Sequence, residues 1–148
     1  SDLFNSVSNI NGSISEWDVS NVTDMSGMFM SSTGFNQDIS NWDVSNVTDM
    51  SNMFYGAINF NTPLYPWDVS SVTSMNSMFA FTPSFNKGLG SWDVSSVTDM
   101  DNMFSFSTSF NQDLSDWCVS NISSEPSNFK DGADSWTLPQ PIWGSCSP

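Results

Sequence analysis

Apolar residues recur along this chain with a period of 25 residues. Residues 17–29 read WDVSNVTDMSGMF, residues 42–54 read WDVSNVTDMSNMF, and residues 92–104 read WDVSSVTDMDNMF. The tryptophans that open the repeats are Trp17, Trp42, Trp67, Trp92 and Trp117. A fixed period of this length is typical of stacked repeats, in which each repeat forms one coil and buries its apolar face against neighbouring coils.

The first part of each coil has the pattern of a short strand. Ile39, Trp42 and Val44 follow the LxxLxL spacing of a leucine-rich repeat. Trp42 and Val44 alternate with polar neighbours, as the residues of a half-buried strand do. Stacked coils would place these strands side by side in parallel, about 4.8 Å apart, with the tryptophan column inside.

The second part of each coil has the pattern of a short helical turn. Met50, Met53 and Phe54 stand three and four residues apart, so they would share one helix face. Thr48 is a suitable N-cap for this turn, and Asp49 suits its positive end. We therefore expect an α/β solenoid of the leucine-rich-repeat type, with short parallel strands and short helical turns in stacked 25-residue coils.

The repeat organises residues 1–148 as a single domain with three parts. Residues 1–16 match only the second half of a coil, residues 17–122 carry the repeats, and residues 123–148 form a C-terminal cap. The repeat dissolves at the start of this cap, where Glu125 stands in place of an apolar residue. Because the first coil starts in mid-turn, we expect the natural chain to continue upstream with more repeats.

The two cysteines, Cys118 and Cys146, predict a disulfide that pins the cap to the last coil. A disulfide is typical of a secreted protein, whereas two free thiols would be typical of a cytosolic one. Cys118 occupies a column that alternates with inward residues, so it should point outward. Closing a loop of this length stabilises the folded chain by about 3.5 kcal/mol in the chain-entropy model.

The charge balance restricts the partners and the chemistry. The chain has 16 acidic residues against two lysines, no arginine and no histidine, and its net charge is −14. Nucleic acids and anionic membrane surfaces are bound through Lys and Arg, so both are excluded. No apolar run is long enough to span a bilayer. The usual acid–base, oxyanion and phosphate-binding devices are missing, so we expect no enzyme.

The motif W-D-V-S-N-V-T-D-M-S-x-M-F, followed by F-N-Q-D, Ile or Leu, and Ser, resembles the repeat of the BspA-like leucine-rich-repeat surface proteins, including the Mycoplasma-type lipoprotein repeat. The similarity covers residues 3–124, and P-I-W-G-S-C near the chain end looks like the cap of many such proteins. The resemblance implies an extracellular or cell-surface module that binds or adheres to host, matrix or cell-surface proteins or glycans. It implies no catalytic residues, and we expect the fragment to be monomeric.

Four aromatic residues that break the repeat are candidate ligand contacts: Tyr55, Tyr65, Phe81 and Phe106. Phe81 and Phe106 share one column on adjacent coils, in a variable loop. An exposed pair there could stack on a sugar ring or on a protein side chain, and local packing of the loop is the alternative. An exposed groove lined by these residues would favour a glycan ligand.

A column of aspartates is the candidate cation site: Asp18, Asp43, Asp68 and Asp93. Four carboxylates about 5 Å apart repel each other by roughly 1 kcal/mol per neighbouring pair in water. Calcium bridging between coils would offset this repulsion and would make the protein a calcium-stabilised spacer of a larger surface protein. Alternatively, each aspartate caps its own Asx turn. The sequence favours the turn, because calcium-loop motifs are absent.

Two further sets of polar columns have structural interpretations. Asparagine recurs in every coil, which predicts an asparagine ladder that satisfies backbone groups; its members are Asn11, Asn36, Asn61, Asn86 and Asn111. The serine and threonine columns that include Ser45 and Thr48 would suit turn capping. A regular hydroxyl array could also match ice or a polysaccharide, but the many aspartates on the same face argue against this.

Overall fold

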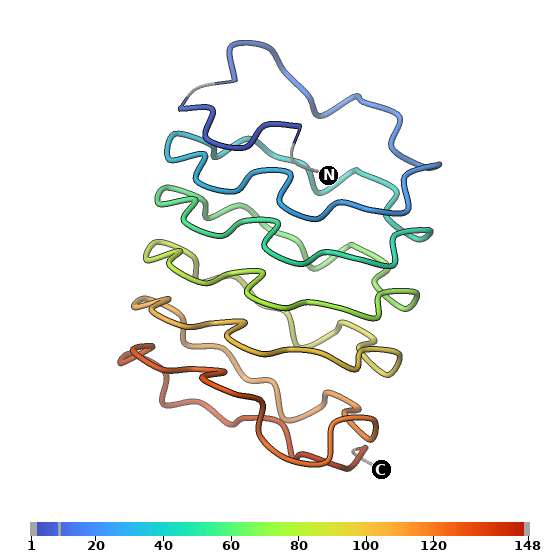
Figure 1. The fold of residues 1–148 in the computed structure, drawn as a ribbon, viewed down its shortest axis with the longest axis vertical. Coiled ribbons are helices and arrows are strands. Elements are labelled where there is room, and N and C mark those ends of the chain that lie inside the picture. Colours follow the sequence, from blue (N-terminus) through green and yellow to red (C-terminus); the bar gives the residue numbers. More distant parts are fainter. Residues whose placement is uncertain (1–2, 9, 147–148) are drawn as a thin grey trace.

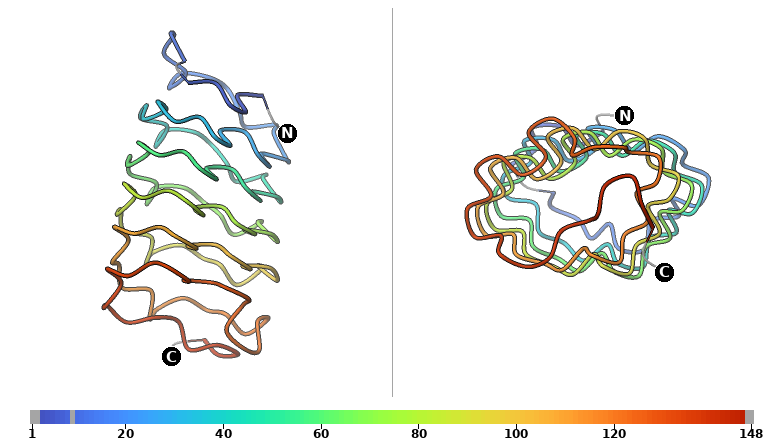
Figure 2. Two further views of the ribbon diagram at one scale, coloured as in Figure 1. Left: turned by 60° about the vertical axis from the view of Figure 1, so that its left-hand side comes forward. Right: turned by 90° about the horizontal axis from the view of Figure 1, so that it is seen from below.

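The computed structural model of the chain describes residues 3–8 and 10–146, which form a stack of coils (Figure 1). Each coil runs once around an elongated ring, and successive coils lie on one another from the N-terminal to the C-terminal end. The view along the stack shows the coils nearly superimposed around a common interior (Figure 2). The 25-residue period of the sequence is therefore the circumference of one coil.

Backbone hydrogen bonds between adjacent coils join residues 24 or 25 positions apart. The N–H of Thr48 donates to the C=O of Thr23 over 2.8 Å, and the N–H of Met25 donates to the C=O of Asp49 over 2.9 Å. The same pair of bonds recurs between the next coils. These bonds form three isolated parallel bridges, which join Asp24 to Asp49, Asp49 to Ser74, and Ser74 to Asp99.

The expected α/β solenoid of the leucine-rich-repeat type is wrong. The described residues form no helix, so none of them could cross a membrane as a helix, and their strand pairing is limited to the single-residue bridges. Trp42 and Val44, expected in a strand, form no bridge. The bridges lie instead in the column of Asp49, where the helical turn was expected to begin. The apolar spacing thus indicated which side chains face inward, but not the backbone conformation.

A left-handed residue in each coil prevents the expected helical turn. Asn52 has a φ of 58°, and a right-handed helix cannot continue through a residue with a positive φ. The N–H of Asn52 donates to the C=O of Asn76 in the next coil over 2.8 Å, instead of to a carbonyl four residues earlier. Residues 51–56 consequently form a series of turns. The same column contains Gly27, Ser77 and Asn102, with φ angles of 61°, 54° and 58°.

Two ladders of phenylalanine rings form the centre of the core. The first contains Phe29, Phe54, Phe79 and Phe104, and the second contains Phe35, Phe60, Phe85 and Phe110; all are at most 1% exposed. Ring centroids in the first ladder are 5.6–5.7 Å apart between coils, with interplanar angles of 6–10°. Within a coil, the two ladders lie 3.9–4.3 Å apart. Each ring therefore packs on the coils above and below it, so neighbouring coils stabilise one another.

Four of the five tryptophans in the column are buried, as the sequence predicted, whereas Trp17 in the first coil is 43% exposed. Each indole N–H donates to the C=O found 28 residues earlier, in the preceding coil, over 2.9–3.0 Å. The residues concerned are Trp42, Trp67, Trp92 and Trp117, which are 1–4% exposed. This column therefore supplies both apolar burial and a polar link between coils.

The cap closes the C-terminal end of the stack by changing the ring geometry. Trp136 packs edge-on against Phe104 and Phe110, with interplanar angles of 75° and 86°. Perpendicular rings of this kind end the face-to-face ladders. The predicted disulfide between Cys118 and Cys146 is confirmed, and it ties the end of the cap to the last coil.

Substitutions at Asn52 can distinguish the observed left-handed conformation from the expected helical turn. In a helix, alanine at this position would be more stable than asparagine and glycine would be less stable. In the left-handed conformation the order reverses, because a Cβ there costs about 1–2 kcal/mol and glycine is free of that cost. Thermal melts should show Asn52→Ala below the wild type and Asn52→Gly above Asn52→Ala. The reverse order of the two variants would indicate a helical turn.

Candidate functional site

Three of the four candidate aromatic residues contact one another across adjacent coils. The rings of Phe81 and Phe106 are stacked, with centroids 4.9 Å apart and an interplanar angle of 15°. The ring of Tyr55 is 5.4 Å from that of Phe81 and is tilted by 57°. We call these three residues the aromatic stripe. The fourth candidate, Tyr65, is 65% exposed, lies in a turn, and makes no ring contact with the stripe among the described residues.

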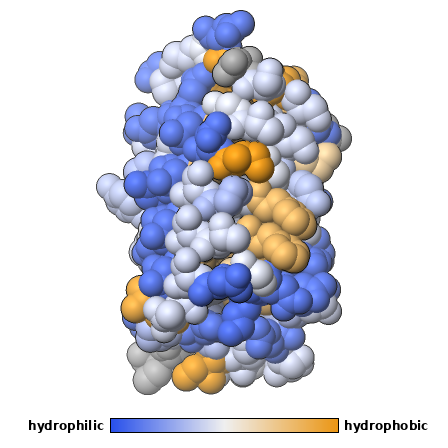
Figure 3. All heavy atoms as spheres, turned by 90° about the vertical axis from the view of Figure 1, so that its left-hand side faces the viewer, coloured by the Kyte–Doolittle hydropathy of each residue, from blue (hydrophilic) through white to orange (hydrophobic). Residues whose placement is uncertain are grey.

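The aromatic stripe is exposed to solvent. Phe81 and Phe106 are 41% and 50% exposed, and Tyr55 is partly buried. Ile58, which is 41% exposed, lies in a turn three residues after Tyr55. The view onto this side of the molecule shows apolar surface between hydrophilic flanks (Figure 3). Exposed apolar surface rimmed by polar residues is typical of an interaction site.

The backbone holds both phenylalanines of the stripe in an unfavourable conformation. Phe81 and Phe106 each have a φ of 56°. Their column otherwise contains small residues with positive φ, namely Ser6, Ser31 and Gly56. A bulky side chain at positive φ costs about 1–2 kcal/mol, and such strained residues cluster at functional sites. The protein therefore keeps two exposed aromatic rings at positions where the backbone conformation favours glycine.

The contacts within the stripe cover part of its ring surface, since Phe81 and Phe106 each have one face against the other ring. Phe81 has Phe106 against one face and Tyr55 beside it. Phe106 also lies against Gly132 of the following coil, where an added Cβ would come within 2.5 Å of the ring. Stacking therefore removes one face of each phenylalanine from contact with a ligand.

The aspartate column caps turns within its own coils. Oδ1 of each aspartate accepts the backbone N–H and the Oγ–H of the serine two residues later, over 3.0–3.1 Å and 2.6 Å respectively. These bonds, led by the serine hydroxyl, lower the pKa of the carboxyls of Asp18, Asp43, Asp68 and Asp93. Neighbouring aspartates raise the pKa of Asp43, but their effect ranks below that of the hydrogen bonds. The Asx turn, which the sequence favoured, is thus present.

The arrangement of the aspartates gives no additional support for calcium binding. Within residues 3–8 and 10–146, no group of three or more acidic or cysteine side chains is placed so that it could hold a metal ion. Calcium binding by the aspartate column therefore stays a prediction.

Polar side chains also link the coils along two other columns. The Oδ1 atoms of Asn36, Asn61 and Asn86 each accept the N–H of the asparagine 25 residues later, over 2.8–3.0 Å. This is the predicted asparagine ladder. The hydroxyls of Thr48, Thr73 and Thr98 donate to the threonine C=O of the preceding coil over 3.1–3.3 Å. These columns therefore serve the stacking of the coils.

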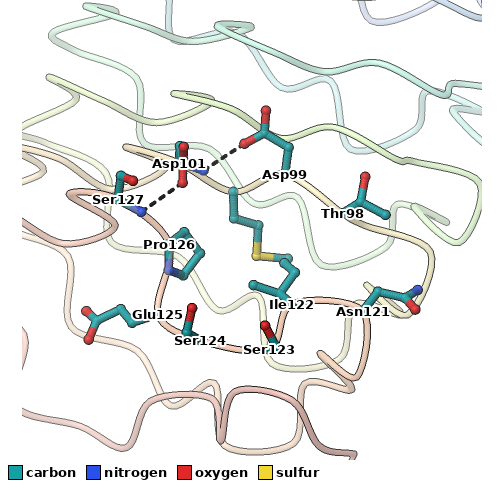
Figure 4. A pocket seen from close by; sticks show the side chains of 11 residues that line it. Thr98, Asp99, Asp101, Asn121, Ile122, Ser123, Ser124, Glu125, Pro126 and Ser127 are labelled. Atoms are coloured by element: carbon teal, nitrogen blue, oxygen red, sulfur yellow. Dashed lines mark hydrogen bonds between the residues drawn. The ribbon is translucent and has the colours of Figure 1, made fainter.

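A pocket of about 380 Å³ opens at the C-terminal end of the bridge ladder (Figure 4). Its walls come from residues 98–101 of the last complete coil and residues 121–127 at the start of the cap. Three carboxylates line it, those of Asp99, Asp101 and Glu125. The sequence predictions did not include this pocket. The sequence feature that could have indicated the pocket is Glu125, which interrupts an apolar column.

The model of one protein family matches the chain twice, over residues 1–80 and over residues 62–143. That family is described as "Mycoplasma protein of unknown function, DUF285". The chain belongs to this family. No curated protein and no solved structure matches the chain. Membership in DUF285 agrees with the internal repeat, and the description of the family assigns no activity.

The aspartate turns should make stability dependent on pH in the acidic range. Hydrogen bonds from Ser26 lower the pKa of Asp24 from 3.8 to about 2, and the column of Asp68 is shifted in the same direction. Because these pKa values are lower in the folded chain than in the unfolded chain, the stabilisation is present above about pH 4 and is lost as the pH falls toward about 2. The melting temperature should therefore drop across this range. Asp68→Asn, whose amide oxygen still accepts hydrogen bonds without titrating, should weaken the dependence, and a flat profile would contradict the turn assignment.

Calcium should leave the melting temperature unchanged, because the aspartate oxygens already accept hydrogen bonds from serine. The measurement is a thermal melt in EDTA, repeated in about 5 mM Ca²⁺, a concentration sufficient for weak extracellular calcium sites. A rise of several degrees that disappears in Asp43→Asn and Asp68→Asn would contradict this expectation and support bridging between coils.

Proposed function

We propose that this protein is an extracellular or cell-surface module without catalytic activity that binds a partner protein through the aromatic stripe. The observation that carries this proposal is the combination of exposure and strain at Phe81 and Phe106. Aromatic residues dominate the binding energy of protein interfaces. Strain that does not serve packing of the core is consistent with a role in binding.

A protein partner suits the stripe better than a glycan does. Sugars stack on open aromatic faces, and the stacking of Phe81 on Phe106 already covers one face of each ring. Ring edges and the nearby Ile58 instead suit apolar side chains of a protein. Because the net charge of the chain is −14, the partner should carry basic residues around its apolar contact.

Two alternative functions have less support. An ice- or polysaccharide-binding array needs hydroxyls that are available to the ligand, whereas Ser45 donates to Asp43 and Thr48 donates to Thr23. A calcium-stabilised spacer would not require strained aromatic residues at the surface. The extracellular location rests on the disulfide and on the resemblance to BspA-like surface proteins, which stays a prediction.

The double variant Phe81→Gly/Phe106→Gly tests the proposal. Glycine relieves the left-handed strain while it removes both rings, so the melting temperature should stay close to that of the wild type. Binding to the matrix or cell-surface protein that the wild type recognises on an immobilised panel should weaken about 30-fold or more, as for loss of an interface hot spot. Such a trade of stability for function is common at binding sites.

Tyr65→Ala is the matched control, because it removes an exposed aromatic ring that does not belong to the stripe. This variant should bind like the wild type. Unchanged binding by the double glycine variant would contradict the proposal. Binding of the wild type to a glycan array alone would contradict the choice of a protein partner.

A further inference from the structure

The parallel ladder that runs along the stack stops at the pocket. In each preceding pair of coils, a threonine C=O accepts an N–H from the next coil, and the methionine N–H two residues later donates to a C=O of the next coil. After Thr98 this pairing ends, and it resumes where the N–H of Asn102 donates to the C=O of Ser127 over 2.8 Å. That bond spans 25 residues, whereas the equivalent bond from Asn52 to Asn76 spans 24, so the cap contains one extra residue before Ser127.

The extra residue carries the cap away from the last coil and leaves two backbone groups unpaired. Among the described residues, neither the C=O of Thr98 nor the N–H of Met100 has a hydrogen-bond partner. Met100 is completely buried, and a buried backbone N–H without a partner is rare in native proteins. Both residues line the pocket. The pocket therefore contains the donor and the acceptor of an unfilled parallel bridge.

The walls of the pocket are strongly acidic. Glu125 and Ser124 lie on the side formed by the cap, and Asp99 and Asp101 lie on the side formed by the coil (Figure 4). Asp101 holds the rim in place, since its Oδ1 accepts the N–H of Ser127 over 2.8 Å. The volume of about 380 Å³ lies within the range of sites that hold small ligands or a few residues of a peptide.

We propose that this pocket binds an extended, positively charged peptide segment of a partner protein. One residue of the segment would donate its N–H to the C=O of Thr98, and the next would accept the N–H of Met100. Strand addition at an exposed edge is a common mode of peptide recognition, in which backbone bonds give affinity and neighbouring side chains give specificity. A lysine or arginine of the segment would face Asp99 and Glu125. The site is separate from the aromatic stripe, so it does not depend on the function proposed above.

The probe is a capped peptide that imitates the coil segment of residues 47–50 with lysine in place of aspartate, acetyl-Val-Thr-Lys-Met-amide. In the coils, the threonine of this segment donates its N–H to the preceding threonine C=O. Titration into the isotope-labelled protein should shift the amide signals of Met100 and Ser124 in a saturable manner. The same peptide methylated on the threonine nitrogen lacks the donor and should bind about fivefold more weakly.

Charge is tested by one variant and by one peptide. Glu125→Gln should weaken binding about two- to fivefold, the range expected for a partly exposed ion pair. Asp134→Asn removes an equal charge from an exposed position outside the pocket and should bind like the wild type. The acidic peptide acetyl-Val-Thr-Glu-Met-amide should not bind.

The proposal is overturned if the Met100 amide shows no saturable shift at millimolar peptide. It is also overturned if the methylated or the acidic peptide binds as well as the basic one, because binding would then not use the unfilled bridge or the carboxylates. Equal weakening by Glu125→Gln and Asp134→Asn would indicate general attraction to an acidic protein and would equally reject the site.

Discussion

Hydrogen bonds between adjacent coils are the interaction on which this structure depends. Turns within a coil pair only part of the backbone groups, as where the N–H of Val47 donates to the C=O of Val44, and unpaired groups are costly when they are buried. Adjacent coils supply further partners, at a distance of 24 or 25 residues in the sequence. The indole N–H groups of the tryptophans and the Oδ1 atoms of the asparagines extend the same linkage to side chains. A change in coil length interrupts these bonds where it occurs, as the extra residue in the cap does after Thr98, which explains why the period of the repeats is so regular.

The same constraint explains why the two candidate sites lie where the regularity is broken. The aromatic stripe occupies a column whose backbone conformation suits glycine or serine, and Phe81 and Phe106 depart from that preference. The pocket lies where one extra residue in the cap interrupts the bridge ladder after Asp99. In a repeat protein, uniform columns serve stacking, so departures from uniformity are the informative positions.

Much of the side-chain arrangement was predictable from the sequence. The inward tryptophans, the asparagine ladder, the turn-capping aspartates and the disulfide between Cys118 and Cys146 all follow from column and spacing arguments, and the structure has each of them. The shared column of Phe81 and Phe106 likewise predicted their positions on adjacent coils. Tyr55 joins them from the adjacent column, with its ring 5.4 Å from that of Phe81. The pocket could not be predicted, since its unpaired backbone groups depend on the path of the cap.

The sequence by itself determined the 25-residue coil, the identity of the buried columns and the position of the cap, because apolar periodicity records burial directly. The tertiary structure alone decided the backbone conformation of each coil. A spacing of three and four residues is compatible with a helix and also with consecutive turns that bring the same side chains inward. The segment forms turns because alternate N–H groups, including that of Asn52, bond to the next coil, and because Asn52 itself has a left-handed φ. Local sequence preferences cannot predict this hydrogen bond, because its acceptor lies one full coil away in the chain.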